Sequence, residues 1–114
     1  MSLIVQKFGG TSVGTIQRIK NVASRAISEF KAGNKVVVTV SAMSGETNRL
    51  VGLVNDITGF HSKREYDVVV SAGEQVSIGL LAIAIQTQGH KAKSYLGWQA
   101  PVLTDSAYAK ARIL

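Results

Sequence analysis

Apolar and polar positions follow two different periods over the first forty residues, which predicts a strand, a helix and a second strand. Leu3 to Phe8 is a short β-prone run that ends at two adjacent glycines. From Ile16 to Phe30 the apolar residues recur at helical spacing, and Gly33-Asn34 then supplies a stop signal. Lys35 to Val40 is an almost unbroken β-branched run, typical of a parallel strand covered on both faces. The pattern therefore predicts a βαβ unit with a right-handed crossover.

The later pattern predicts two more helices and several short strands. A helical apolar pattern covers Leu50 to Ile57, a polar loop is expected over His61 to Glu65, and Asp67 to Val70 favours a strand locally. Ser71 to Glu74 has the S-x-x-E spacing of a capping box and is expected to open an apolar helix over Val76 to Gln88. The remaining expected elements are short strands at Lys91 to Leu96 and at Val102-Leu103, with Pro101 between them.

Composition places the chain among folded globular domains. It has 114 residues with one Pro, 11 Gly and 46% hydrophobic residues, which fits one domain or part of one. Because it has no cysteine, a disulfide framework, a thiolate metal site and a cysteine nucleophile are excluded. Lys7 follows the N-terminal apolar run too early for a signal peptide, and the apolar run Val76 to Ile85 is shorter than the roughly 20 residues that span a bilayer. We therefore expect a cytoplasmic protein without a membrane partner.

The net charge of +6 is compatible with nucleic acid, nucleotides or anionic metabolites as partners. Many of these charges are accounted for by the solvated outer face of the first helix. No aromatic side chains interleave them as stacking platforms, so we expect no nucleic-acid partner. The basic residues in or beside this helix are Arg18, Lys20, Arg25, Lys31 and Lys35.

Three turns are candidates for chemistry because they are predicted to follow other elements and to open helices. They are Lys7 to Ser12, Ser41 to Thr47, and Ser71 to Glu74. Ligands of open α/β sheets bind at that edge, where helix N-termini favour anions. The adjacent Gly9 and Gly10 would let backbone approach a phosphate that also meets the charge of Lys7. The arrangement predicts phosphate handling, although neither the P-loop nor the G-x-G-x-x-G fingerprint is present.

Several of these residues also have purely structural interpretations. Gly9 and Gly10 could form only a tight turn, and Lys7 could be a surface lysine at a strand end. Ser41 and Ser44 could cap the following helix.

The same holds for the remaining candidates. Thr47 would by default be a solvated hydroxyl, and a capping-box glutamate at position 74 needs no ligand at all. His61 and His90 stand alone without a second ligand at metal-binding spacing, so we expect no metal site. No G-x-S-x-G elbow points to a serine hydrolase.

Taken together, the three motifs resemble those of aspartokinases, the aspartate-specific branch of the amino acid kinase family. Lys7 to Val13 (KFGGTSV) resembles the family's first signature, Ser41 to Leu50 (SAMSGETNRL) its second block and Ser71 to Glu74 (SAGE) its third. The order and separations also resemble the family, and the similarity covers essentially all 114 residues.

The resemblance implies an α/β fold, a three-layer αβα sandwich with a mainly parallel sheet that is incomplete at the C-terminal side. It also implies a helix over residues 67–70, and ATP and Mg²⁺ as cofactors. Residues 1–114 would be the N-terminal part of the kinase catalytic domain, with ACT-type regulatory domains absent from the chain. The implied product is 4-phospho-L-aspartate, in the pathway to lysine, threonine and methionine.

By the same resemblance, Lys7 matches the lysine between phosphoryl donor and attacking carboxylate. Phe8, Gly9 and Gly10 belong to the phosphate-binding signature, in which the glycine N–H groups hold the transferring phosphate. Ser41 matches a serine that borders both phosphate and substrate.

Two more residues match the substrate side of the family's site. Thr47 matches the aspartate-contacting threonine, and Glu74 the glutamate that pairs with the substrate's α-amino group. Residues expected to complete the nucleotide site would lie beyond Leu114, so we expect this chain alone to be inactive.

Two alternatives remain open. One is another kinase of the same superfamily, acting on glutamate, acetylglutamate, carbamate or a nucleotide. The other is a non-catalytic dimerisation or interaction module, since exposed sheet edges favour association. The expected partners are L-aspartate and ATP, with a homo-oligomer or association with the rest of the enzyme.

Overall fold

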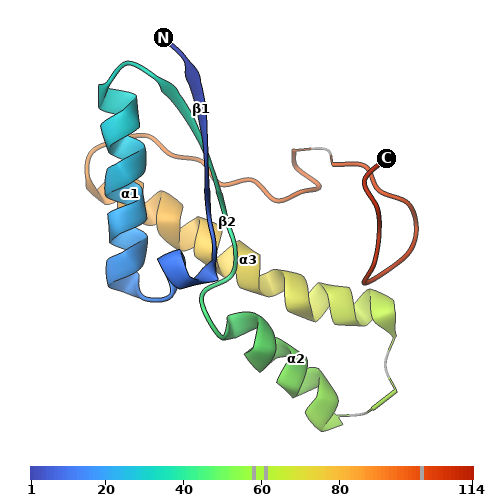
Figure 1. The fold of residues 1–114 in the computed structure, drawn as a ribbon. Coiled ribbons are helices and arrows are strands. Elements are labelled where there is room, and N and C mark those ends of the chain that lie inside the picture. The colour runs from blue at the N-terminus through green and yellow to red at the C-terminus, as the bar shows by residue number, and fades with distance from the viewer. Residues whose placement is uncertain (58, 61, 101) are drawn as a thin grey trace.

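Two parallel strands and the helix that connects them form the first half of the fold. The structure is a computed structural model that describes residues 1–57, 59–60, 62–100 and 102–114. Strand β1 (Leu3–Phe8) pairs with β2 (Lys35–Val40) in parallel, with Leu3 opposite Lys35 and Phe8 opposite Val40 (Figure 1). The predicted βαβ unit is confirmed. The other elements are the 3₁₀ helix η1 (Gly10–Val13) and the helices α1 (Ile16–Lys31), α2 (Glu46–Ile57) and α3 (Lys63–Thr87).

Helix α1 begins and ends where the sequence predicts. The hydroxyl of Thr15 accepts a hydrogen bond from the N–H of Arg18 at 3.2 Å, which caps the first turn. Gly33 has a φ of +94°, a left-handed conformation that costs glycine little, so the helix stops there. Its apolar face is buried at Ile19, Val22, Ala23, Ala26 and Ile27.

Helix α3 corrects three expectations at once. The strand expected locally at Asp67 to Val70 and the helix start expected at Ser71 to Glu74 both lie inside this 25-residue helix. The helix that the family resemblance implied over residues 67–70 is confirmed. The real cap is Ser62, whose hydroxyl accepts from the N–H of Glu65 at 3.5 Å, so part of the expected polar loop is helical. Ser62 and Glu65 share the S-x-x-E spacing, nine residues upstream of the pair chosen from the sequence. Packing on neighbouring helices overrides the local β preference of the valine run.

The short strands predicted after α3 are not formed. His61 and Pro101 lie outside the described residues. Lys91 to Leu96 and Val102-Leu103 form no strand, which corrects the prediction. A strand needs a hydrogen-bonded neighbour, and neither segment pairs with β1 or β2. Within residues 102–114, the pairing present is an isolated antiparallel bridge between Thr104 and Ile113.

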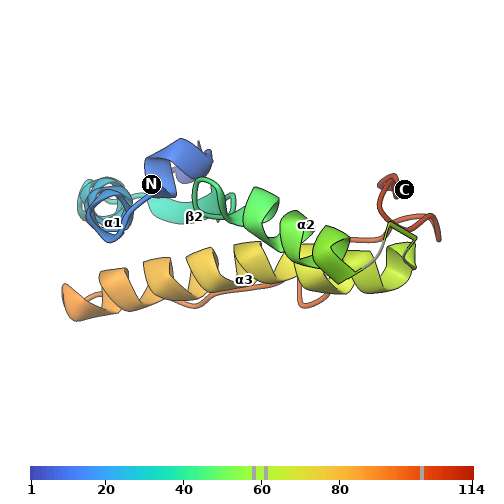
Figure 2. The ribbon, with the colours of Figure 1, turned by 90° about the horizontal axis from the view of Figure 1, so that it is seen from below.

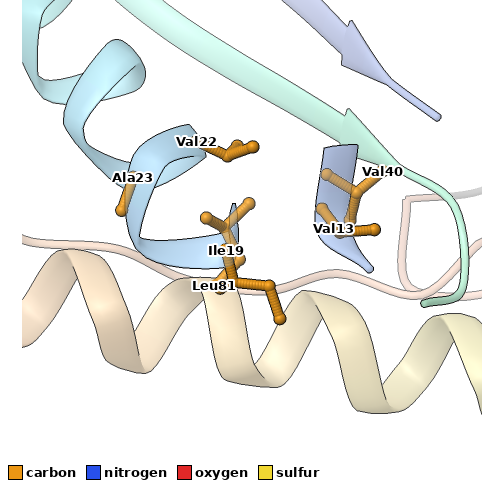
Figure 3. Packing of buried hydrophobic residues seen from close by; sticks show 6 residues of the cluster. All are labelled: Val13, Ile19, Val22, Ala23, Val40 and Leu81. Carbon is orange, nitrogen blue, oxygen red and sulfur yellow. The ribbon is translucent and has the colours of Figure 1, made fainter. Parts of the chain in front are cut away.

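The core lies between the sheet, α1, η1 and α3. Helix α3 runs along one side of α1, β2 and α2, as Figure 2 shows in the view turned by 90°. Side chains from four elements converge in this core (Figure 3). They are Val13, Ile19, Val22, Ala23, Val40 and Leu81.

One face of the sheet is open. Leu3, Val5 and Val37 are 64%, 65% and 49% exposed, whereas Val38 on the other face packs against the core. The prediction that β2 is covered on both faces is wrong for the described residues. Their helices pack against only one face of the sheet. The α/β class with a parallel sheet is confirmed, with the layered fold incomplete in this chain.

Helix α3 also corrects the expectation about apolar length. Among the described residues it is the one helix that is long enough and apolar enough, by length and composition alone, to cross a membrane. Core helices of soluble proteins pass the same test, so this is weak support for a membrane span. Here α3 packs against both α1 and α2.

Candidate functional site

Three segments that are distant in sequence meet at the carboxyl end of β1 and β2. The N–H of Ser41 donates to the carbonyl of Phe8 at 3.2 Å, which joins the two strand ends. The carbonyl of Ser41 in turn accepts from the hydroxyl of Ser77 on α3 at 2.8 Å. The segment from Ser41 to Ser44 therefore lies between η1 and α3, and the first two predicted turns come together there.

The two adjacent glycines have different surroundings. A Cβ added to Gly10 would lie 2.9 Å from the carbonyl oxygen of Ala42, which is closer than side chains tolerate. Gly10 is therefore required by the chain's own packing. A Cβ added to Gly9 would meet nothing within 4 Å, and the φ of −77° and ψ of 175° at Gly9 are open to any residue. The described fold gives no reason for a glycine at position 9.

Lys7 and Phe8 point to opposite faces of β1. Lys7 is exposed on the open face, in register with Thr39 of β2. Its ammonium group makes no hydrogen bond or ion pair with the described residues. The side chain of Phe8 is half-buried against the core. A phosphate-binding role for Phe8 would therefore fall to its backbone, since its ring serves packing.

A basic hollow lies beside η1. The Nη1 of Arg18 donates to the carbonyl of Thr11 at 2.7 Å, which fastens η1 to α1. Sequence reasoning placed Arg18 on a solvated face and missed this contact, which follows from its position in the first turn of α1, next to η1. The hollow has a volume of about 270 Å³ and is lined by Phe8, Thr11, Ser12, Arg18, Asn21, Val22 and Arg25.

Glu74 lies in the interior of α3 and not at a helix start, so the capping-box interpretation is wrong. A capping glutamate needs a free N–H at a helix N-terminus, and Ser71 instead donates its hydroxyl to the carbonyl of Val68 at 3.4 Å. The Glu74 side chain is partly buried and makes no hydrogen bond or ion pair with the described part of the chain. A carboxylate without a partner at this position remains available to a ligand.

Thr47 is the second residue of α2 and is exposed, next to an ion pair that the sequence analysis did not single out. The carboxylate of Glu46 accepts from Nε of Arg49 at 3.0 Å and from Nη2 at 2.6 Å. This hydrogen bonding lowers the pKa of Glu46 and raises the pKa of Arg49. The signal for this ion pair in the sequence was the three-residue spacing between an acidic and a basic residue, which brings their side chains together on a helix. The pair holds the Arg49 guanidinium against Glu46, in the first turn of α2.

Helix α3 contacts the Ser41 segment closely. A Cβ added to Gly73 would lie 3.0 Å from the Cβ of Ala42 and 3.5 Å from the Cγ of Glu46. One turn further on, Ser77 is 1% exposed and hydrogen-bonded to Ser41. Sequence reasoning missed Ser77, for which the only signal was a small polar residue inside the most apolar helix.

Within the described residues, no group of three or more histidine, cysteine or acidic side chains could hold a metal ion. The ring of His90 makes an edge contact with Phe30, with 5.7 Å between centroids. His61 lies outside the described part of the chain.

Comparison with known proteins agrees with this geometry. The model of the amino acid kinase family matches residues 2–112, so the chain belongs to that family. It is 60% identical over 114 residues to an aspartokinase of Pseudomonas aeruginosa, and 52% identical over 113 residues to aspartokinase 2 of Bacillus subtilis. These alignments cover 100% and 99% of this chain and 28% of each relative.

A solved structure gives the same result for the fold. The crystal structure of aspartate kinase from Synechocystis matches with a TM-score of 0.73 and 50% identity, covering 75% of this chain and 15% of that one. The resemblance inferred from the three motifs is confirmed. The chain spans about 28% of the length of the curated relatives that it matches.

Proposed function

We propose that the protein containing this chain is an aspartate kinase, which transfers the γ-phosphate of ATP to the side-chain carboxylate of L-aspartate. The supporting observation is the meeting of the Gly9-Gly10 turn, the Ser41 segment and the Glu74 region of α3 at one sheet edge. These are the three segments through which the chain resembles aspartokinases. Their convergence gives a single place for a phosphate and an amino acid.

In the proposed reaction a carboxylate oxygen of aspartate forms a bond to the γ-phosphorus while the bond from that phosphorus to the ADP oxygen breaks. The nucleophile is already an anion, so no general base is needed. Such a reaction needs positioning and neutralisation of charge on the transferring group. The unpaired ammonium of Lys7 supplies a positive charge, and the open space at Gly9 admits a phosphate oxygen to the backbone. Ser41 borders the same point.

For the amino acid, we propose that Glu74 pairs with the α-ammonium group and that Thr47 contacts the substrate from the first turn of α2. A partly buried carboxylate without a protein partner suits an ammonium ligand, since a charge-assisted hydrogen bond contributes about 1.5–3 kcal/mol.

Mg²⁺ is proposed as the usual companion of ATP. Proteins hold Mg²⁺ through one or two carboxylates together with substrate phosphates. Within the described residues no group of three or more histidine, cysteine or acidic side chains could hold it, so substrate phosphates would supply most of its ligands. We place the adenine and ribose contacts outside residues 1–114.

We further propose that the open sheet face and the exposed apolar side of α3 are covered by the remainder of the kinase domain or by a second copy. Leu3, Val5 and Val76 are each more than half exposed, which is costly for large apolar residues in water. With that covering α3 would be a core helix, and we propose that the protein is cytoplasmic.

The test is a hydroxamate assay on the full-length protein, with ATP, Mg²⁺ and either aspartate or glutamate. Formation of hydroxamate from aspartate and not from glutamate supports the proposal. Phosphorylation of glutamate, acetylglutamate, carbamate or a nucleotide instead would identify another branch of the family. Absence of turnover with every acceptor would favour the interaction module.

A further inference from the structure

We infer that Ser77 is a positioning residue, whose buried hydroxyl holds the Ser41 segment against α3 and so fixes Ser41 relative to Glu74. The inference rests on the proposed function, because Ser41 and Glu74 are the two residues proposed to border the amino acid from different elements. Ser77 lies outside the three motifs that carry the family resemblance.

The geometry joins both residues through one oxygen atom. The Oγ of Ser77 lies 2.8 Å from the carbonyl oxygen of Ser41 and 3.1 Å from that of Glu74. A serine hydroxyl has one proton to donate, so the two carbonyls share it in a three-centre bond with the shorter arm on Ser41. The bond spans 36 residues of sequence.

A serine hydroxyl in a helix can be satisfied by a carbonyl of its own helix and needs no partner on another segment. Serine hydroxyls in helices commonly bond a carbonyl one turn back, as Ser24 does with Lys20 at 3.1 Å. At Ser77 the corresponding contact to Glu74 is the longer of the two. Within the described residues, the Ser77 hydroxyl is the hydrogen-bond donor to the Ser41 carbonyl, so its removal leaves that carbonyl without this partner.

The neighbouring packing sets the distance that the hydroxyl maintains. Gly73 lies one turn before Ser77 and has no side chain, which lets α3 approach Ala42. Close approach at Gly73 and the hydrogen bond at Ser77 therefore act on the same segment. Ser77 is 1% exposed, so water cannot easily replace the lost hydroxyl.

The first experiment is steady-state kinetics on the full-length protein with Ser77→Ala. We expect kcat/KM for aspartate to fall about tenfold, the effect of one buried hydrogen bond, with a melting temperature within a few degrees of the parent. Ser77→Cys has a similar size and a weak donor, so it should behave like Ser77→Ala. Ser24→Ala, which removes a hydroxyl that bonds only its own helix, is the matched control and should leave kinetics unchanged.

Amide hydrogen exchange gives a readout that does not depend on the reaction. In Ser77→Ala we expect faster exchange in residues 41–46 and unchanged exchange in α1, whereas general destabilisation would accelerate both. Unchanged exchange of residues 41–46 in Ser77→Ala would mean that the hydroxyl does not hold the segment, and would overturn the inference.

The outcomes separate this inference from the proposed function. Turnover of aspartate by the parent with unchanged kinetics in Ser77→Ala would overturn the positioning role and leave the function standing. Failure of the parent to phosphorylate aspartate would remove the proposed function. The exchange of residues 41–46 would then decide alone whether Ser77 holds the segment.

Discussion

Replacing the two glycines after β1 by alanine, one at a time, should separate a ligand-binding glycine from a packing glycine. At Gly9 the backbone angles are ordinary for alanine, and the added Cβ meets no atom within 4 Å. Folding should therefore be unaffected or improved by about 0.4–1 kcal/mol, since alanine restricts the unfolded chain. At Gly10 the added Cβ would press against the backbone of Ala42 at 2.9 Å, and relieving such overpacking costs about 1–3 kcal/mol.

The loss of activity should be larger in Gly9→Ala, although it is the more stable of the two variants. If the N–H of Gly9 holds the transferring phosphate, a methyl group in that space blocks the approach. Loss of one donor to a developing charge lowers kcat by about 10²–10³. We therefore expect Gly9→Ala to be stable and nearly inactive, and Gly10→Ala to be destabilised with reduced activity as a consequence.

The assay is hydroxamate formation from aspartate alongside thermal melting, on the full-length protein. Gly52→Ala is the matched control, because Gly52 lies within α2 and a Cβ there also meets nothing within 4 Å. It should gain about 0.5–1 kcal/mol of stability and keep full activity. If Gly9→Ala retained activity within twofold of the parent, the open space at Gly9 would not be a phosphate site and the reasoning would be refuted.

Three further predictions concern charge and completeness. Lys7→Ala should keep the fold and lower kcat by about 10²–10³, because Lys7 is exposed and has no partner within the described residues; steady-state kinetics showing less than a tenfold loss would make it a surface residue. Glu74→Gln should lower kcat/KM for aspartate roughly ten- to a hundred-fold with little change in melting temperature, and unchanged aspartate kinetics would remove Glu74 from the site. The 114-residue chain alone should show no kinase activity and should self-associate through its open sheet face; a stable monomer in sizing chromatography that turns over ATP would contradict both expectations.

Local sequence patterns predicted the first half of the fold correctly. The elements β1, α1 and β2 follow from strand and helix periods together with the stop at Gly33, which are all properties of neighbouring residues. Helix α3 was divided wrongly because its valine run is β-prone in isolation and because the S-x-x-E spacing occurs twice. The choice between Ser62 and Ser71 as the cap depends on packing against α1 and α2, which no local pattern contains.

The candidate site was predictable in part for the same reason. The turn at Gly9 and the Ser41 segment have recognisable motifs, so their meeting at one sheet edge could be expected. The contacts of Ser77 with Ser41 and of Gly10 with Ala42 join residues that are more than thirty positions apart. Such contacts exist only after the chain has folded.

Helix α3 makes this region intolerant of changes in chain length. Gly73 and Ser77 face the same segment from successive turns. One residue inserted between them would rotate everything beyond it by about 100° about the helix axis, and either the close approach or the hydrogen bond would be lost. Substitutions can be absorbed at many exposed positions of α3, but a one-residue insertion or deletion between positions 73 and 77 cannot. Among related sequences, length variation should therefore fall in the irregular segment after Gln88, where no helical register is broken.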